Sequence, residues 1–150
     1  MNEAAKAYWN DYWKDQKMPG HVSAWQFGAD PDQLAQLVID GIKTATCSAY
    51  VFYEKENEPL PKNDEYSIIL NRKDEPAAII KNVEVSVIPM NEVSEEFAVA
   101  EGEGDRTYRY WWDVHEQFFR SELRKLGVEF SEDMLLVCER FELIDVKRKE

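Results

Sequence analysis

Residues 34–50, LAQLVIDGIKTATCSAY, pass from a helical pattern to an extended one within a few positions. Just before this stretch, Asp30 and Pro31 are residues typical of a helix N-cap and of a first helical position. Apolar residues then recur at helical spacing as far as Gly41, a residue type that commonly ends a helix. The residues from Thr44 to Cys47 favour an extended chain. We therefore predict a helix that ends near Gly41 and leads directly into a strand.

Helices are expected to be inserted between the strands along the rest of the chain. Further strands are predicted at 22–27, 65–71, 77–88 and 134–144 and helices at 3–17, 94–100 and 107–126, while 48–58 fits either a helix or a loop. Within 77–88, valines at 83, 85 and 87 alternate with polar residues, which is typical of a half-buried strand.

These elements predict an α+β fold, a small mixed or antiparallel β-barrel of about five strands with inserted and flanking helices. Residues 1–150 are expected to form a single domain, because the chain is too short for two comfortable ones. Residues 1–20 are expected to be an N-terminal helical extension that docks an aromatic face on the body of the protein.

The composition limits what this domain can bind. Thirty acidic residues against eighteen basic ones give a net charge of −12, and duplex nucleic acid is held mainly by Lys and Arg. A long duplex is therefore excluded as a partner. No apolar run approaches the ~18–20 residues that span a bilayer, and the N-terminus lacks the pattern of a signal peptide. We expect no membrane contact and a cytoplasmic location.

The two cysteines, Cys47 and Cys138, lie far apart and without nearby histidine pairs. A structural zinc site usually takes about four ligands at short spacings. We therefore expect two free thiols, no metal site and no cofactor.

Lys43 and Thr46 form the first candidate for chemistry. A lysine at a helix-to-strand junction becomes a base if burial lowers its pKa, and a threonine hydroxyl activated by an amine is a nucleophile. The alternative is structural, since lysine at a helix C-terminus complements the helix dipole. In a regular strand, residues 43 and 46 would point to opposite faces. They share a pocket only if the chain turns between Gly41 and Thr44.

The second candidate is the acidic run Glu101-Gly102-Glu103-Gly104-Asp105. Its acids could bind a divalent cation, position Lys43, or hold a general acid or base; the spacing of an EF-hand calcium loop is absent. The alternative is an acidic loop in which Asp105 or Thr107 caps the following helix. His115 lies on the apolar stripe of that helix, where a core role is favoured over a catalytic one.

Two segments together resemble the ASCH domain family. LAQLVIDGIKTATCSAY contains its GxKxxT signature, and FAVAEGEGDRTYRYWWDVHEQFF (97–119) is similar to the acidic-glycine and Trp/His/Phe block of its YhfF-like branch, formerly a domain of unknown function. The resemblance implies a PUA-like barrel with a cleft beside the GxKxxT loop. One departure is Ser48, which stands where many ASCH domains have Arg.

The resemblance also implies a small nucleoside- or nucleotide-like ligand, because some small ASCH proteins hydrolyse the amide of N4-acylated cytidine. Carried over by motif, their catalytic Lys, Thr and Glu fall on Lys43, Thr46 and Glu101. In this mechanism Lys43 deprotonates Thr46, which attacks the amide carbon, while Glu101 holds the lysine and helps to protonate the departing amine. The ligand-binding residues predicted in addition are Gly41, Thr44, Trp25, Glu103, Asp105 and Arg106.

Two other functions stay open on the sequence alone. The first is a non-catalytic reader of RNA that uses the same cleft and stacks a base on Trp25. The second is a protein-interaction domain, including a homodimer formed through the aromatic N-terminal helix.

Overall fold

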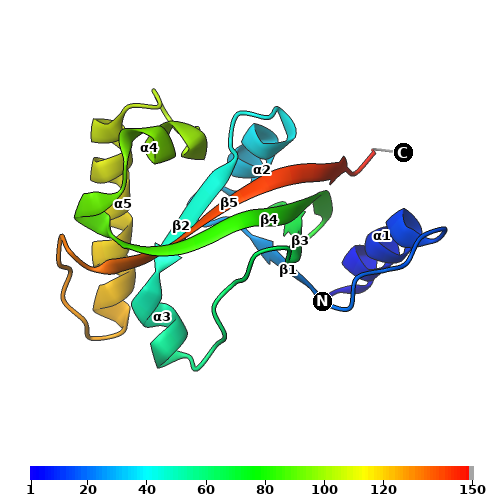
Figure 1. The fold of residues 1–150 in the computed structure, drawn as a ribbon, viewed down its shortest axis with the longest axis horizontal. Helices are drawn as coiled ribbons and strands as arrows, with labels where there is room; N and C mark the ends of the chain where they lie inside the picture. The colour runs from blue at the N-terminus through cyan, green and yellow to red at the C-terminus, as the bar shows by residue number, and fades with distance from the viewer. Residues whose placement is uncertain (149–150) are drawn as a thin grey trace.

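The computed structural model describes residues 1–148, which fold into a five-stranded curled sheet surrounded by helices (Figure 1). The helices are α1 (Glu3–Trp13), α2 (Pro31–Ile39), α3 (Tyr50–Lys55), the short 3-10 helix η1 (Met90–Glu92), α4 (Glu95–Glu101) and α5 (Tyr108–Lys125). The strands are β1 (Val22–Gln26), β2 (Ala45–Ala49), β3 (Tyr66–Leu70), β4 (Pro76–Pro89) and β5 (Leu135–Val146). The α+β class is confirmed, and residues 48–58, which were left open, contain the end of β2 and α3.

The sheet has the order β1-β3-β4-β5-β2. Within residues 1–148 the β1–β3 pair alone is parallel, and the other three pairs are antiparallel. The long strands β4 and β5 carry register shifts at Ile79/Ile80 and Asn82/Glu84, and such bulges bend a strand and increase its twist. The sheet therefore curls into a half-barrel, with β1 and β2 as its ends.

Helices cover both faces of the sheet at the β3–β4 end. The neighbouring residues Ile68 and Ile69 point to opposite faces, and both are fully buried. Ile68 packs in the cluster that contains α1, together with its cross-strand partner Ile79. Ile69 packs in the cluster that contains α2. Burial on both faces explains why β3 and the first half of β4 are apolar runs without alternation.

The second half of β4 differs from the expected valine pattern. Val83 and Val87 are 55% and 41% exposed, although the alternation predicted that these valines face the core. The register shift between Asn82 and Glu84 leaves Val83 outside the ladder, since the additional residue of a bulge is unpaired.

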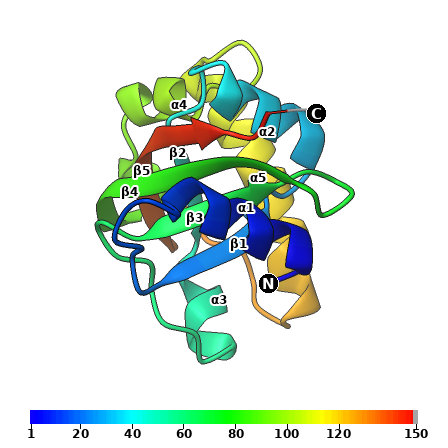
Figure 2. The same ribbon diagram turned by 90° about the vertical axis from the view of Figure 1, so that its right-hand side faces the viewer.

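The N-terminal helix packs on the body of the protein, as predicted. Tyr8 and Trp9 of α1 are buried, and the rings of Trp9 and Trp13 contact Tyr66 of β3 edge-on. The helix ends at Trp13 rather than near residue 17. Figure 2, in which α1 faces the viewer, shows it lying across the sheet. A homodimer through α1 stays a prediction, and it would have to use residues outside this packed face.

A third cluster joins α4 and α5 to β2 and the adjoining half of β5. In Figure 1 these two helices lie at the opposite end of the sheet from α1. Among the described residues, no helix has the length and apolar character needed to cross a bilayer. This cluster is the scaffold that holds the side chains of the candidate site.

Candidate active site

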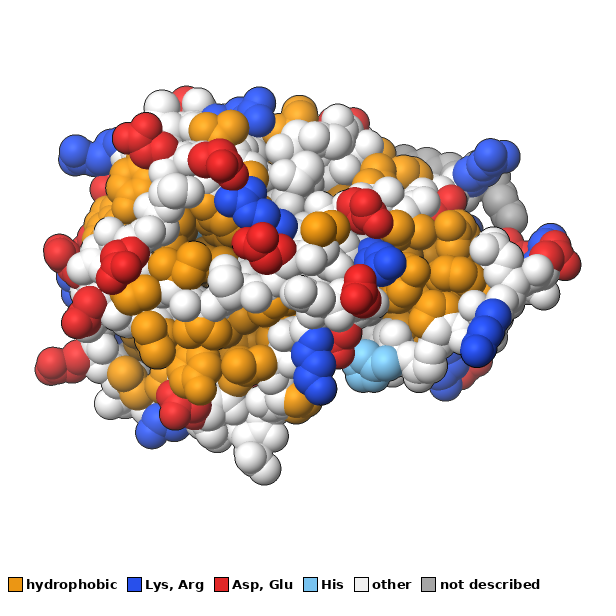
Figure 3. All heavy atoms as spheres, viewed as in Figure 1, with side chains coloured by type: hydrophobic (Ala, Val, Ile, Leu, Met, Phe, Trp, Pro, Cys, Tyr) orange, Lys and Arg blue, Asp and Glu red, His pale blue; other side chains and the backbone are white. Residues whose placement is uncertain are grey.

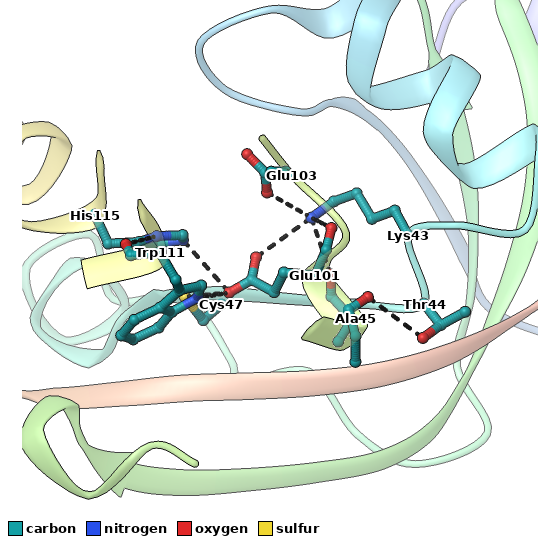
Figure 4. Close-up of polar contacts among 9 residues, drawn as sticks. Lys43, Thr44, Ala45, Cys47, Glu101, Glu103, Trp111 and His115 are labelled. Atoms are coloured by element: carbon teal, nitrogen blue, oxygen red, sulfur yellow. Dashed lines mark hydrogen bonds and ion pairs between the residues drawn. The ribbon is translucent and has the colours of Figure 1, made fainter. Parts of the chain in front are cut away.

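Lys43 is a buried charged side chain at the centre of the site. It is 2% exposed, and its ammonium contacts four oxygen atoms (Figure 4). These are Ala45 O at 2.9 Å, Glu103 Oε2 at 2.9 Å, and Glu101 O and Oε1, both at 3.3 Å. An ammonium has three hydrogens to donate, so its hydrogen-bonding capacity is filled by the protein.

The turn after α2 places Lys43 in this position. Gly41 adopts a left-handed φ of +75°, and the amides of Ile42 and Lys43 both donate to the carbonyl of Leu37. The amide of Thr44 donates to Ala100 O of α4 at 2.7 Å. The regular strand β2 begins only at Ala45. Because residues 41–44 turn, Lys43 and Thr46 line the same cavity, as the sequence required if both were to act together.

Glu101 is the last residue of α4 and is 1% exposed. Its Oε1 faces Lys43, whereas its Oε2 accepts hydrogen bonds from Trp111 Nε1 at 2.6 Å and from Cys47 Sγ at 3.2 Å. His115 Nε2 lies 3.4 Å from the same oxygen. The carboxylate is therefore held on both sides by groups from β2, α5 and the turn after α2.

His115 is fixed by a second contact. Its Nδ1 lies 2.7 Å from Trp111 O; a carbonyl only accepts, so Nδ1 carries a hydrogen. The imidazole stacks on the Trp111 ring with centroids 4.5 Å apart. Its Nε2 is therefore aimed at Glu101.

The charges of this cluster stabilise one another. Burial alone would lower the pKa of Lys43, but the negative charges of Glu101 and Glu103 outweigh it, and the pKa of Lys43 is raised. Burial likewise opposes ionisation of Glu101, but Lys43 and His115 hold its pKa below the usual value. The expectation that burial makes Lys43 a base is therefore wrong for the resting site, because the two carboxylates keep it an ammonium.

The neighbouring Cys47 is a thiol rather than a thiolate. Burial and the negative charge of Glu101 raise its pKa well above the usual value. Its hydrogen is accordingly available for the bond to Glu101 Oε2. The prediction of two free cysteines is confirmed.

These side chains line a cavity of about 90 Å³. Its polar wall is formed by Lys43, Thr46, Cys47, Glu101, Glu103 and His115, and its apolar wall includes Phe27, Leu34, Val114 and Phe118. An engineered cavity of roughly 150 Å³ holds benzene. The space here is smaller and partly open, so it fits a small group rather than a whole nucleoside.

The other predicted ligand-binding residues have different positions. Glu103 lines the cavity and contacts Lys43. Trp25 packs edge-on against Phe27, which lines it. Gly41 caps α2, and the Thr44 hydroxyl donates to Ala100 O at 3.3 Å. These last two hold the turn and are not among the lining residues.

Asp105 and Arg106 lie in the exposed loop before α5. The Asp105 carboxylate accepts from the amide and hydroxyl of Thr107 at 2.9 and 2.6 Å. Thr107 in turn is the N-cap of α5, because its hydroxyl accepts from the amide of Tyr110. The three acids of the 101–105 run are thus divided: Glu101 and Glu103 face Lys43, and Asp105 shapes the start of α5.

Cys47, Trp111 and His115 were absent from the predicted site. One signal was available for two of them, since residues four apart such as Trp111 and His115 share a helix face. The contact of that face with Cys47 and Glu101 depends on packing of α5 against β2 and α4.

The fold and the cavity together define a PUA-like domain: a small curled sheet with a buried, charged pocket beside the turn that follows α2. The ASCH domain family model matches residues 23–145. The chain belongs to the ASCH domain family.

Solved structures agree with this assignment. An ASCH domain from Lactobacillus crispatus JV V101 is 34% identical, with a TM-score of 0.92 over 97% of this chain and 96% of that one. Protein EF3133 from Enterococcus faecalis V583, described by family model DUF984, is 41% identical, with a TM-score of 0.85 over 97% and 91%. A hypothetical protein, PH0355, at 16% identity and a TM-score of 0.51 shares the fold alone. Among curated proteins no match is found.

Proposed function

We propose that this ASCH domain binds a small nucleoside-like ligand and hydrolyses its N-acyl group, as an amidohydrolase of the N4-acylcytidine type. The observation that carries the proposal is the shared cavity of Lys43, Thr46 and Glu101. It presents a hydroxyl, a buried cation and carboxylates to one small space. The acyl group occupies this space and the base lies at its mouth.

The raised pKa of Lys43 changes how the nucleophile is activated. An ammonium cannot accept the Thr46 proton, so a carboxylate takes it. Glu103 suits this role, because it lines the cavity and its side chain is 21% exposed. The Lys43 charge stabilises the negative oxygen that forms when Thr46 attacks the carbonyl.

The remaining steps use the same groups. The proton on Glu103 passes to the departing amine, which leaves an acyl ester on Thr46. Water then attacks this ester, with Glu103 again taking a proton and the Thr46 hydroxyl recovering one. The products are a carboxylic acid and the free amine. Glu101 positions Lys43 and contributes no proton.

The alternative of an RNA reader has less support. On the face shown in Figure 3, Lys and Arg side chains are scattered among Asp and Glu rather than gathered into a patch. The cavity itself carries two carboxylates for one lysine. An RNA ligand would require a basic path for its phosphates.

The test is incubation of the full chain with cytidines N4-acylated by acyl groups from acetyl to benzoyl, with release of cytidine measured by chromatography. Turnover is expected for the short acyl groups. Thr46→Val should abolish it, and Glu103→Gln should lower kcat by about 10²–10⁴-fold, the range for loss of a general base.

Ser48→Ala is the matched control, because this hydroxyl lies in the same strand but pairs with Tyr53 at 2.8 Å. It should retain wild-type turnover. Circular dichroism of each variant shows that the fold is kept. No turnover of any substrate, or full activity in Thr46→Val, would refute the mechanism.

A further inference from the structure

Three side chains from three different elements bring metal-ligand atoms together. Cys47 of β2, Glu101 of α4 and His115 of α5 each present one such atom, and all three atoms lie within 4.8 Å of one another. Glu101 Oε2 is 3.2 Å from Cys47 Sγ and 3.4 Å from His115 Nε2. In a tetrahedral zinc site, bonds of about 2.0–2.3 Å place neighbouring ligand atoms roughly 3.3–3.8 Å apart. The two short distances lie close to the edges of such a tetrahedron, and the third pair, from Cys47 and His115, lies within 4.8 Å.

The surrounding contacts are those that zinc ligands use. A ligating histidine commonly donates its other ring N–H to a carbonyl or carboxylate, which fixes the ring. His115 has this contact, through Nδ1 to Trp111 O at 2.7 Å. Ligating carboxylates are also hydrogen-bonded, and Trp111 Nε1 donates to Glu101 Oε2 at 2.6 Å. One residue, Trp111, thus supports two of the three ligands.

The local charge is balanced by a dication once the ligands have lost their protons. Glu101 and Glu103 both contact Lys43, and Glu101 also faces His115. In the metal-bound form Cys47 is a thiolate and His115 is neutral, so the two carboxylates and the thiolate exceed Lys43 by two negative charges. A divalent ion therefore neutralises the cluster. Lys43 contacts Oε1 of Glu101 and leaves Oε2 to the ion.

We propose that Cys47, Glu101 and His115 form a binding site for a divalent cation of the zinc class. The ion has three protein ligands, and its fourth position opens into the cavity that the same side chains line. Binding transfers the thiol proton of Cys47 to solvent, together with the Nε2 proton where His115 carries one. This site shares Glu101 and the cavity with the proposed hydrolysis, but no step of that reaction passes through the ion.

The test uses Co²⁺ as a spectroscopic probe on the reduced, metal-free full chain, without substrate. A thiolate-to-cobalt charge-transfer band is expected, saturating at one ion per chain. Cys47→Ser should abolish the band. His115→Gln should weaken binding at least tenfold, which is the lower end of the effect of removing even an outer-shell partner.

Cys138→Ser is the matched control, because Cys138 is the cross-strand partner of Cys47 but is not one of the three ligands. It should keep both the band and the affinity. A second readout is thermal unfolding, since an ion that binds the folded chain raises Tm. Zn²⁺ should raise Tm in wild type and in Cys138→Ser, and less in His115→Gln.

Three results would overturn the site: no charge-transfer band in wild type, a band that survives in Cys47→Ser, or a band lost in Cys138→Ser. Because no substrate is present, a failed hydrolase assay leaves this test unaffected. Cobalt binding without any N4-acylcytidine turnover would refute the hydrolase and support the metal site.

Discussion

Lys43 stays charged because its ammonium contacts a small network of carboxylate and carbonyl oxygens. Moving an ammonium out of water costs several kcal/mol, and an ion pair offsets this only when geometry is good and further hydrogen bonds are made. Lys43 has two carboxylates and two carbonyl groups within 3.3 Å. Removing Lys43 alone would leave Glu101 buried without this partner. Thr46→Val is therefore the sharper functional probe, since it changes no charge.

Gly102 is a position where the close approach of backbone segments demands glycine. Its φ is +72°, and a Cβ there would lie 2.5 Å from Ile42 O. Gly102→Ala should lower the free energy of unfolding by about 2–5 kcal/mol, the sum of left-handed strain and overpacking. Urea denaturation measures this change.

Gly127→Ala provides the control for strain without a clash. Its φ is +71°, and an added Cβ would meet no atom within 4 Å. The expected loss is only about 1–2 kcal/mol. Equal losses at the two positions would contradict the role assigned to the contact between Gly102 and Ile42.

We expect Glu139 to make a pH-dependent contribution to the free energy of unfolding. Burial raises the pKa of this carboxyl above its ordinary value near 4.5, although Asn82 donates a hydrogen bond to it. The folded state therefore binds the proton more tightly than the unfolded state. Stability from this group is greatest below the unfolded pKa and falls as pH rises through the folded pKa.

Glu139→Gln should remove this loss of stability with rising pH, because a Gln side chain does not ionise. Its amide oxygen still accepts the hydrogen bond from Asn82. The free energy of unfolding of the variant, relative to wild type, should rise between pH 4 and pH 7.5, as measured by urea denaturation. Glu142→Gln, on an exposed residue of the same strand, should show no such rise. Parallel profiles for wild type and Glu139→Gln would contradict the assignment.

Among the helices, α1 contributes to stability by covering one surface of the sheet. It buries Ile68 and Ile79 on one face of β3 and β4. Trp9, 4% exposed, is the large side chain at the centre of this contact. The helix thus completes a core that the strands alone leave open.

Trp9→Ala should lower the free energy of unfolding by about 3–5 kcal/mol, since truncating a buried Trp removes apolar contacts and leaves a cavity. Chemical denaturation gives the value. Asn10→Ala, at the neighbouring exposed position, should change stability by less than about 0.5 kcal/mol. A small effect at Trp9 would mean that α1 is only loosely attached.

Helices and strands could be predicted from the sequence where a single local pattern of residues marked them. Asp30 caps α2 as expected, with its side chain accepting from the amide of Gln33. Thr107 caps α5 in the same way. The valines of β4 were misread, because a bulge shifts the strand by one residue and no local pattern marks it.

The net charge of −12 determines which partners the whole protein repels. Half of it lies in the stretch 91–105, which includes Glu101 and Glu103. Those two acids are committed to Lys43, whereas the others in the stretch are exposed. Much of the excess negative charge therefore lies on the surface of the protein.

Binding to a short fluorescent DNA duplex should accordingly be undetectable by anisotropy at about 0.15 M salt, where exposed charges act over roughly 8 Å. Lowering the salt strengthens repulsion as well as attraction, so no binding should appear there either. Saturable binding that weakens with added salt would instead reveal a basic path for phosphates and favour the RNA-reader alternative.

Capping residues, apolar periodicity and the GxKxxT signature were enough to predict most of the helices and strands, the α+β class and the family, because each of these signals is carried by residues close together in the chain. The sequence also paired Lys43 with Glu101 through the family resemblance. The charged state of Lys43, its contact with Glu103 and the meeting of Cys47 and His115 at Glu101 are visible only in the folded molecule. They depend on burial and on the packing of separate elements, since Lys43 and Cys47 lie more than fifty positions from the acids that they contact, and no local pattern encodes this.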